Sequence, residues 1–210
     1  MKTELRKMAV PGLRAFGLAG AISLTALGTA FAQPVPTTFT RTTTGSIATN
    51  LGTSFGPAWG DYNNDGFEDL FVANLEAEND YLYQNNGNGT FTSILTGDIV
   101  NDGAESFGAV WGDYDNDGNL DLLVTAGFFL AQPNLLYRNQ GDGTFAKVTD
   151  GHLVTNPKTG TASGAWGDYD NDGYIDVFVA KVGVTAAQGR DLLYRNDGTG
   201  GFTQILTGTV

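Results

Sequence analysis

The feature that most constrains the fold is an eight-residue block that occurs three times. Trp-Gly-Asp-Tyr-Asn-Asn-Asp-Gly begins at Trp59, and closely similar blocks begin at Trp111 and Trp166. Successive copies are 52 and 55 residues apart. An Asn- and Gly-rich block follows each copy and runs from a tyrosine to a phenylalanine, at 83–91, 137–145 and 194–202. A fixed period of about fifty residues is the signature of a repeat architecture.

Each repeat, at approximately 51–102, 103–156 and 157–210, predicts four short strands. The first ends at the Trp, the second follows the acidic block, the third centres on a Leu-Tyr pair and the fourth begins at the Phe. The second strand is apolar in succession, as in Leu122-Leu123-Val124, which is typical of a strand covered on both faces. Four antiparallel strands per period predict propeller blades that pack face to face. A β-sandwich would explain the strands but not the period.

The fold class expected is therefore all-β: a β-propeller-like array of three four-stranded blades plus an N-terminal extra strand. The extra strand is indicated by Thr38-Phe39-Thr40-Arg41, since residues 38–50 resemble residues 144–156. Three blades are fewer than the roughly four that a closed ring needs. The array is thus predicted to be open or partial. The sequence favours a fragment of a longer protein, and the alternative is assembly with other copies.

The first 32 residues are typical of a secretory signal peptide, with an N-terminal membrane anchor as the alternative. A basic start precedes an apolar run from Ala15 to Gly28, and Ala30-Phe31-Ala32 forms an A-x-A cleavage signal. The run is short for a membrane span. The sequence therefore predicts a propeller domain over 33–210 that is secreted, extracellular or periplasmic, without a membrane span after cleavage.

Composition excludes several classes of protein. The chain has no cysteine, so a disulfide framework, a thiolate zinc site and a cysteine nucleophile are excluded. Its formal charge of −12 argues against nucleic acid as a partner, because phosphate binding needs a basic surface.

The acidic block itself has the spacing of a calcium loop. Numbered from its first Asp, it places oxygen-bearing side chains at positions 1, 3, 5 and 9 and a glycine at position 6, which wraps the chain around a hard cation. The peptide carbonyl of position 7 is expected to be a further ligand. The predicted metal ligands are Asp61, Asn63, Asp65, Phe67 and Asp69; Asp113, Asp115, Asp117, Asn119 and Asp121; and Asp168, Asp170, Asp172, Tyr174 and Asp176.

We expect about three Ca²⁺ ions, one per loop. Ordinary Asp- and Asn-rich turns would explain one such loop, but not three copies whose ligand positions hold eleven of the 23 acidic residues. An EF-hand would need a Glu at position 12, where Val72, Val124 and Val179 stand instead. Because Asn63 is neutral, the count of carboxylates predicts the weakest binding in the first loop.

These motifs resemble the FG-GAP or VCBS repeats of bacterial secreted proteins and of the propeller of integrin α subunits. Phe55-Gly56 and Phe107-Gly108 match the Phe-Gly of that family, and the D-x-[DN]-x-D-G-x-x-D loop matches its calcium loop in every repeat. Ala162-Ser163 departs from it, and the family's Gly-Ala-Pro is absent. The resemblance implies an integrin-α-like β-propeller of the bacterial secreted type.

Two function classes stay open at this point. One is a non-catalytic extracellular recognition or adhesion module with an unknown protein or glycan partner. The other is a scaffold or accessory domain of a polysaccharide-active lyase or hydrolase. We expect the first and no enzymatic activity, because no nucleophile motif occurs and His152 is the only histidine. The partner is expected on the variable connections between second and third strands, where the second repeat has Phe128 and Phe129.

Overall fold

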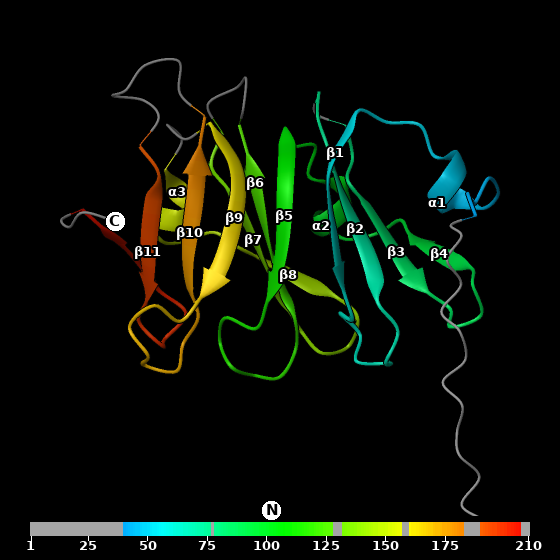
Figure 1. Cartoon of the computed structure of the whole chain (residues 1–210). Helices are drawn as coiled ribbons and strands as arrows, with labels where there is room; N and C mark the ends of the chain where they lie inside the picture. Colours follow the sequence, from blue (N-terminus) through cyan, green and yellow to red (C-terminus); the bar gives the residue numbers. More distant parts are fainter. Residues whose placement is uncertain (1–39, 77, 128–131, 157–159, 183–189, 207–210) are drawn as a thin grey trace, which may run out of the picture. The chain divides into compact units, whose positions relative to one another are not determined.

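The computed structural model describes residues 40–76, 78–127, 132–156, 160–182 and 190–206 (Figure 1). Their elements form three four-stranded antiparallel sheets and three short helices within the unit Arg41–Val210. The first sheet contains β1 (Ser54–Gly60), β2 (Asp69–Asn74), β3 (Tyr81–Asn85) and β4 (Phe91–Ile94). The second contains β5 (Ser106–Gly112), β6 (Asp121–Ala126), β7 (Leu135–Asn139) and β8 (Phe145–Val148). The third contains β9 (Thr161–Gly167), β10 (Asp176–Lys181), β11 (Leu192–Asn196) and β12 (Phe202–Ile205).

The strands follow one another in space in the order of the sequence, so every sheet is a simple antiparallel meander. This arrangement confirms the predicted all-β class and the three four-stranded blades of a partial propeller. The helices α1 (Ser46–Thr49), α2 (Asp98–Asn101) and α3 (His152–Thr155) each precede a blade. Of the expected N-terminal strand, Thr38 and Phe39 lie outside the described residues, and Thr40 and Arg41 are not in a strand. The similarity between residues 38–50 and residues 144–156 is reflected in the helices instead, because α1 occupies the place in the first segment that α3 occupies in the second.

The blades pack face to face through two apolar clusters. Phe71 and Leu82 of the first blade meet Leu122, Val124 and Tyr137 of the second. An equivalent cluster joins the second blade to the third. The helix α2 adds Ile99 and Val100 to the first cluster, and α3 adds the equivalent Leu153 and Val154 to the second. Because β6 lies between both clusters, all six of its residues are buried, which explains its unbroken apolar run.

A tryptophan at the end of each blade's first strand determines how closely blades approach. Trp111 donates its indole N–H to the carbonyl of Ala58 at 3.1 Å, and Trp166 donates to the carbonyl of Val110 at 3.3 Å. The ring of Trp111 lies over Gly60, where a Cβ would come within 2.6 Å of its Cδ1. Gly112 is covered by Trp166 in the same way. The glycine after each tryptophan therefore leaves room for the tryptophan of the next blade.

The described part of the chain contains no helix long and apolar enough to cross a membrane. The predicted signal peptide, residues 1–32, lies outside the described residues.

Candidate metal centre in three acidic loops

The three acidic loops join the first and second strand of each blade and lie at the same edge of the three sheets. They are the teal, green and yellow-orange connections at the bottom of Figure 1. Because every blade is an antiparallel meander, the turns between third and fourth strands lie at this edge too. The second strand of each blade ends, and its third strand begins, at the opposite edge.

The aspartate at position 1 closes each loop. In the first loop Asp61 accepts the peptide N–H of Asp65 at 3.0 Å and that of Gly66 at 2.8 Å. The carboxylates of Asp113 and Asp168 accept the two corresponding N–H groups at 2.9 to 3.1 Å. The Asn at position 4 has a positive φ of 58° or 59° in all three loops, a conformation that Asn tolerates better than most residues. The loop geometry is thus encoded by the same residues in each repeat.

The aspartate at position 9 forms the floor of each loop. Asp69, Asp121 and Asp176 are at most 1% exposed, and each accepts the peptide N–H of the Asn that ends the third strand of its blade, at 2.7 to 2.9 Å. The second oxygen of Asp121 accepts the N–H of Tyr114 at 3.1 Å. In the first loop the second oxygen, Asp69 Oδ2, is buried without a hydrogen bond of standard geometry within the described residues, although the N–H of Tyr62 lies close enough to lower the Asp69 pKa. A buried carboxylate oxygen without a partner is unfavourable, and a bound cation would satisfy it.

Burial raises the pKa of the floor carboxyl groups of Asp69 and Asp121. Desolvation is the largest cause, and it raises the pKa of Asp69 to about 6 and that of Asp121 to about 7. The N–H groups of Asn85 and Tyr62 lower the pKa of Asp69, whereas the neighbouring Asp65 raises it. Ionisation of Asp69 or Asp121 therefore has an electrostatic cost that a bound cation would offset.

The loops differ in how their remaining side chains converge. Asp113, Asp115 and Asp117 each offer an oxygen within 4.8 Å of the others, and so do Asp168, Asp170 and Asp176. These are acidic clusters that could hold a metal ion. In the first loop the amide of Asn63 donates to Asp65 at 3.0 Å. The first loop therefore also brings the side chains of positions 3 and 5 into contact, although Asn63 is neutral.

Two arginines that the sequence did not suggest form ion pairs with carboxylates of the second and third loops. Arg138 Nε lies 2.6 Å from Asp115, and its terminal nitrogen lies 3.4 Å from Asp117. Arg195 pairs in the same way with Asp170 and Asp172, at 2.6 and 2.8 Å. The first blade has Gln84 at the corresponding position. The only sequence signal was a correlation between two positions. The first repeat has a neutral residue at each of them, Asn63 and Gln84, whereas the other repeats have an Asp at the first position and an Arg at the second.

The residues at position 7 contribute a peptide N–H to the position 5 aspartate, at 2.9 to 3.0 Å for Phe67, Asn119 and Tyr174. The side chain of Phe67 lies against Gly87 in the turn that follows the third strand, where a Cβ would be 2.5 Å from the ring. Tyr174 covers Gly198 similarly. The structure thus places position 7 beside the ligands, and the role of its carbonyl as a ligand stays a prediction.

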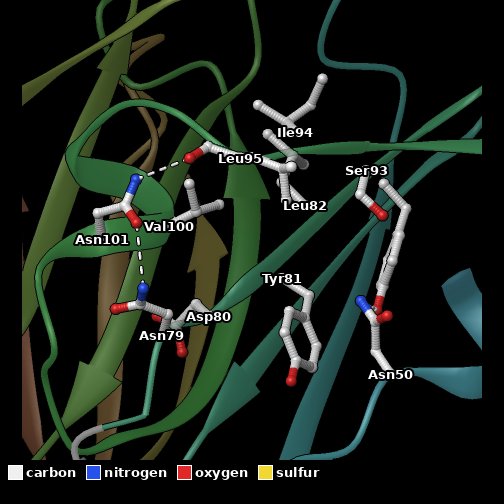
Figure 2. A pocket seen from close by; sticks show the side chains of 11 residues that line it. Asn50, Asn79, Asp80, Tyr81, Leu82, Ser93, Ile94, Leu95, Val100 and Asn101 are labelled. Atoms are coloured by element: carbon white, nitrogen blue, oxygen red, sulfur yellow. Dashed lines mark hydrogen bonds between the residues drawn. The ribbon is translucent and has the colours of Figure 1, made fainter.

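A small cavity of about 150 Å³ lies away from these loops, between α2 and the outer strands of the first blade (Figure 2). The side chain of Asn101 bridges its wall by accepting from Asn79 and donating to the carbonyl of Leu95, both at 3.1 Å. Asn50 donates to the hydroxyl of Tyr83 at 2.9 Å. The amides of Asn50, Asn79 and Asn101 are thus satisfied, whereas the Ser93 hydroxyl in the same wall is buried and makes no hydrogen bond within the described residues.

Comparison with known protein families gives one match. A family described as FG-GAP-like repeat matches residues 61–124 and 128–179, which together are more than half of the chain and include all three acidic loops. No curated protein matches the chain.

Proposed function

The chain belongs to the FG-GAP-like repeat family, and on this basis we propose that it is an exported recognition or adhesion module whose blades are stabilised by calcium. The observation that carries the proposal is the position 9 aspartate. It is buried beneath the same loop in all three repeats, and its neighbours supply carboxylate oxygens above it.

The donor set favours calcium over other metals. The loops offer carboxylate, amide and peptide oxygens, and no cysteine occurs in the chain, so soft metals lack their preferred ligands. Calcium accepts roughly six to eight oxygens in flexible geometry, whereas magnesium requires a near-ideal octahedron. Asp61 would hold the ion from position 1, Asp65 from position 5 and Asp69 from below, with equivalents in the other loops. The ion would supply positive charge that permits Asp69 to stay ionised while buried.

Calorimetric titration of chelator-treated protein tests this proposal. We expect about three sites, with Kd values between roughly 10⁻⁶ and 10⁻³ M, and much weaker binding of Mg²⁺. Replacing Asp121 by Asn should abolish one site. The exposed Asp150, which lies outside the loops, provides the control variant Asp150→Asn. Fewer than two calcium sites, or equal binding of both metals, would overturn the proposal.

Export is supported by the signal-like sequence of residues 1–32. We propose that the processed chain is extracellular or periplasmic and begins near Gln33. N-terminal sequencing of the protein recovered from culture medium or periplasm tests this placement. Recovery of an uncleaved chain in the cytoplasm or membrane would contradict it.

We also propose that the module binds rather than catalyses. The carboxyl groups with raised pKa in the loops, Asp69 and Asp121, lie buried as floor residues, which suits metal binding better than contact with a substrate. The edge opposite the loops is the proposed partner surface, because its connections differ most among the repeats. Phe128 and Phe129 lie there in sequence but outside the described residues. If a protein or glycan partner is identified, Phe128→Ala with Phe129→Ala should weaken its binding and leave calcium uptake unchanged, and no detectable cleavage of polysaccharide is expected.

A further inference from the structure

We propose that the chain associates head to tail with a second copy of itself, and that this contact repeats the one between its own blades. The first face is the side of the first blade that points away from the second blade. It carries Trp59, Phe91 and Ile47. The last face is the side of the third blade that points away from the second blade. It carries Gly167, Tyr169 and Phe178.

The internal interfaces show what such a contact contains. Beside the tryptophan-to-carbonyl bond, the side chain of Asn139 donates to the carbonyl of Tyr62 in the preceding blade at 2.7 Å. Asn196 donates to Tyr114 in the same way, also at 2.7 Å. A third bond joins adjacent loops, since Asn116 donates to the carbonyl of Gly173 at 2.9 Å. At the first interface the equivalent Asn64 lies 3.5 Å from the carbonyl of Gly118 and donates to Asn119 Oδ1 at 3.0 Å. The Trp and third-strand Asn bonds thus recur closely at two successive interfaces, and the loop bond recurs with a longer distance at the first.

An aromatic group is also repeated at both interfaces. The ring of Tyr62 lies 6.1 Å from that of Trp111 and 5.6 Å from that of Phe145 in the next blade. At the second interface Tyr114 lies 5.7 Å from Phe202, and Phe202 lies 6.0 Å from Trp166. Each group therefore takes its tyrosine from one blade and its tryptophan and phenylalanine from the next.

The first face has the tryptophan half of this contact without the tyrosine. Trp59 lies 6.2 Å from Phe91, as in the other blades, but it is 56% exposed. Both residues line a surface hollow together with Ile47 and Ala48 of α1. The corresponding residues of α2 and α3 are buried between blades, whereas Ile47 is half-buried and Ala48 exposed.

The last face has the tyrosine half without the tryptophan. Tyr169 is 49% exposed, whereas Tyr62 and Tyr114 are 3% and 4% exposed. A Cβ on Gly167 would meet no atom within 4 Å, although Gly60 and Gly112 are each covered by a tryptophan. A trough here is lined by Ala165, Gly167, Tyr169, Phe178 and Leu193.

The chain therefore holds both halves of one interface on opposite sides of the same array, so a second copy offers each face the surface that it lacks. The expected bonds follow from the repeat: Trp59 Nε1 to the carbonyl of Ala165, the Asn85 amide to the carbonyl of Tyr169, and the Asn171 amide to the carbonyl of Gly66. Tyr169 of one copy would complete the pair of Trp59 and Phe91 in the other. Such a contact is heterologous, so it produces a closed ring where the rotation permits and an open array otherwise.

Sedimentation of the purified exported chain in calcium, up to about 100 µM, tests the proposal. We expect species larger than one copy. Two variants block one face each: Trp59→Glu on the first face, and Gly167→Val on the last, where the single chain has room for the added side chain. Each variant alone should be monomeric. Leu95→Glu is the control, because Leu95 is 75% exposed and belongs to neither set of contacts.

The mixture of the two blocked variants gives the decisive measurement. Each retains the face that the other lacks, so an equimolar mixture should form a complex of two copies and no larger species. Circular dichroism and calcium uptake identify variants that fail to fold, and Tyr169→Glu then replaces Gly167→Val. A monomeric wild-type chain, oligomers that persist in both variants, or a mixture of folded variants that stays monomeric would each overturn the proposal.

Discussion

Arg195 binds Asp170 through an Nε to Oδ2 contact of 2.6 Å, and its guanidinium also reaches Asp172 in the same loop. The arginine therefore occupies oxygens at positions 3 and 5, which are among the predicted calcium ligands. Arg138 occupies the equivalent oxygens of the second loop. A bound ion would have to share or displace these contacts.

Removing these arginines should strengthen calcium binding. We expect Arg138→Gln and Arg195→Gln each to raise the affinity of the corresponding loop by about two- to fivefold, because an exposed ion pair is weak and its loss frees two carboxylates. Calorimetric titration measures the change. The reciprocal variant Gln84→Arg should weaken the first loop. Unchanged affinities in all three variants would show that the arginines do not compete with the ion.

The same ion pairs alter the expected order of affinities. The count of carboxylates predicted the weakest site in the first loop, which has Asn63 in place of an aspartate. An arginine offsets the extra carboxylate in each of the other loops, so the difference in loop charge disappears. We expect the first loop to bind calcium more weakly than the other two only when both arginines are removed. Calorimetric titration of the double variant Arg138→Gln with Arg195→Gln checks this order.

Chelation should lower the melting temperature markedly. Each ion that binds only the folded state adds about 2.7 kcal/mol at a hundredfold excess over its Kd. The variant Asp117→Ala with Asp172→Ala should lose most of this calcium dependence, and Asp150→Ala should keep it. Differential scanning calorimetry with and without chelator provides the test. A wild-type melt that is the same in both conditions would show that the loops act only as turns.

The stability of the calcium-free protein should fall as pH rises, and the buried carboxyl group of Asp80, which lies outside the acidic loops, should contribute to this fall. It accepts the N–H of Asn74 and the hydroxyl of Ser106, both at 2.8 Å, and desolvation raises its pKa to about 7. An acid whose folded-state pKa is raised favours the folded state below its unfolded pKa, and this contribution is lost as pH rises through about 7. The melting temperature should therefore decline from pH 4 towards about 8, and less steeply in Asp80→Asn. An equal slope in both proteins would contradict this assignment.

Matched glycine substitutions measure the blade contact. Gly60→Ala should destabilise the protein by about 1 to 3 kcal/mol, because the added methyl overlaps the ring of Trp111. Gly167→Ala adds the same methyl at the equivalent place on the last face, where no atom lies within 4 Å. Urea denaturation of the two variants under conditions where the chain is monomeric should show a cost only for Gly60→Ala. Similar losses would mean that the ring of Trp111 is not the cause.

The repeat alone was sufficient to predict the strands, because the features that specify them are local. The Trp that ends a first strand, the glycine at position 6 and the Asn-Gly turn before Phe91 each act within a few residues. Comparing three copies then removed the ambiguity that a short apolar run leaves. The place of Asp69 beside its loop also followed from spacing.

The contacts that the sequence did not reveal are tertiary. Arg138 reaches Asp115 only because β7 pairs with β6 in a particular register, and Asn139 reaches Tyr62 only because two blades are in contact. Spacing carries no signal of either. The short α2 was also missed, because a pair such as Ile99-Val100 is too brief to show helical periodicity.

The burial of all six residues of β6 has a consequence for how the molecule opens. In an array whose units touch only adjacent units, stability is a sum of each unit and its neighbour contacts. Of the described sheets, only the second has a sheet on each side, so it loses two contacts when it unfolds and the outer sheets lose one. Amide hydrogens of β6 should consequently exchange with solvent last, after those of β2 and β10, and fluctuations of the single chain should begin at its outer sheets.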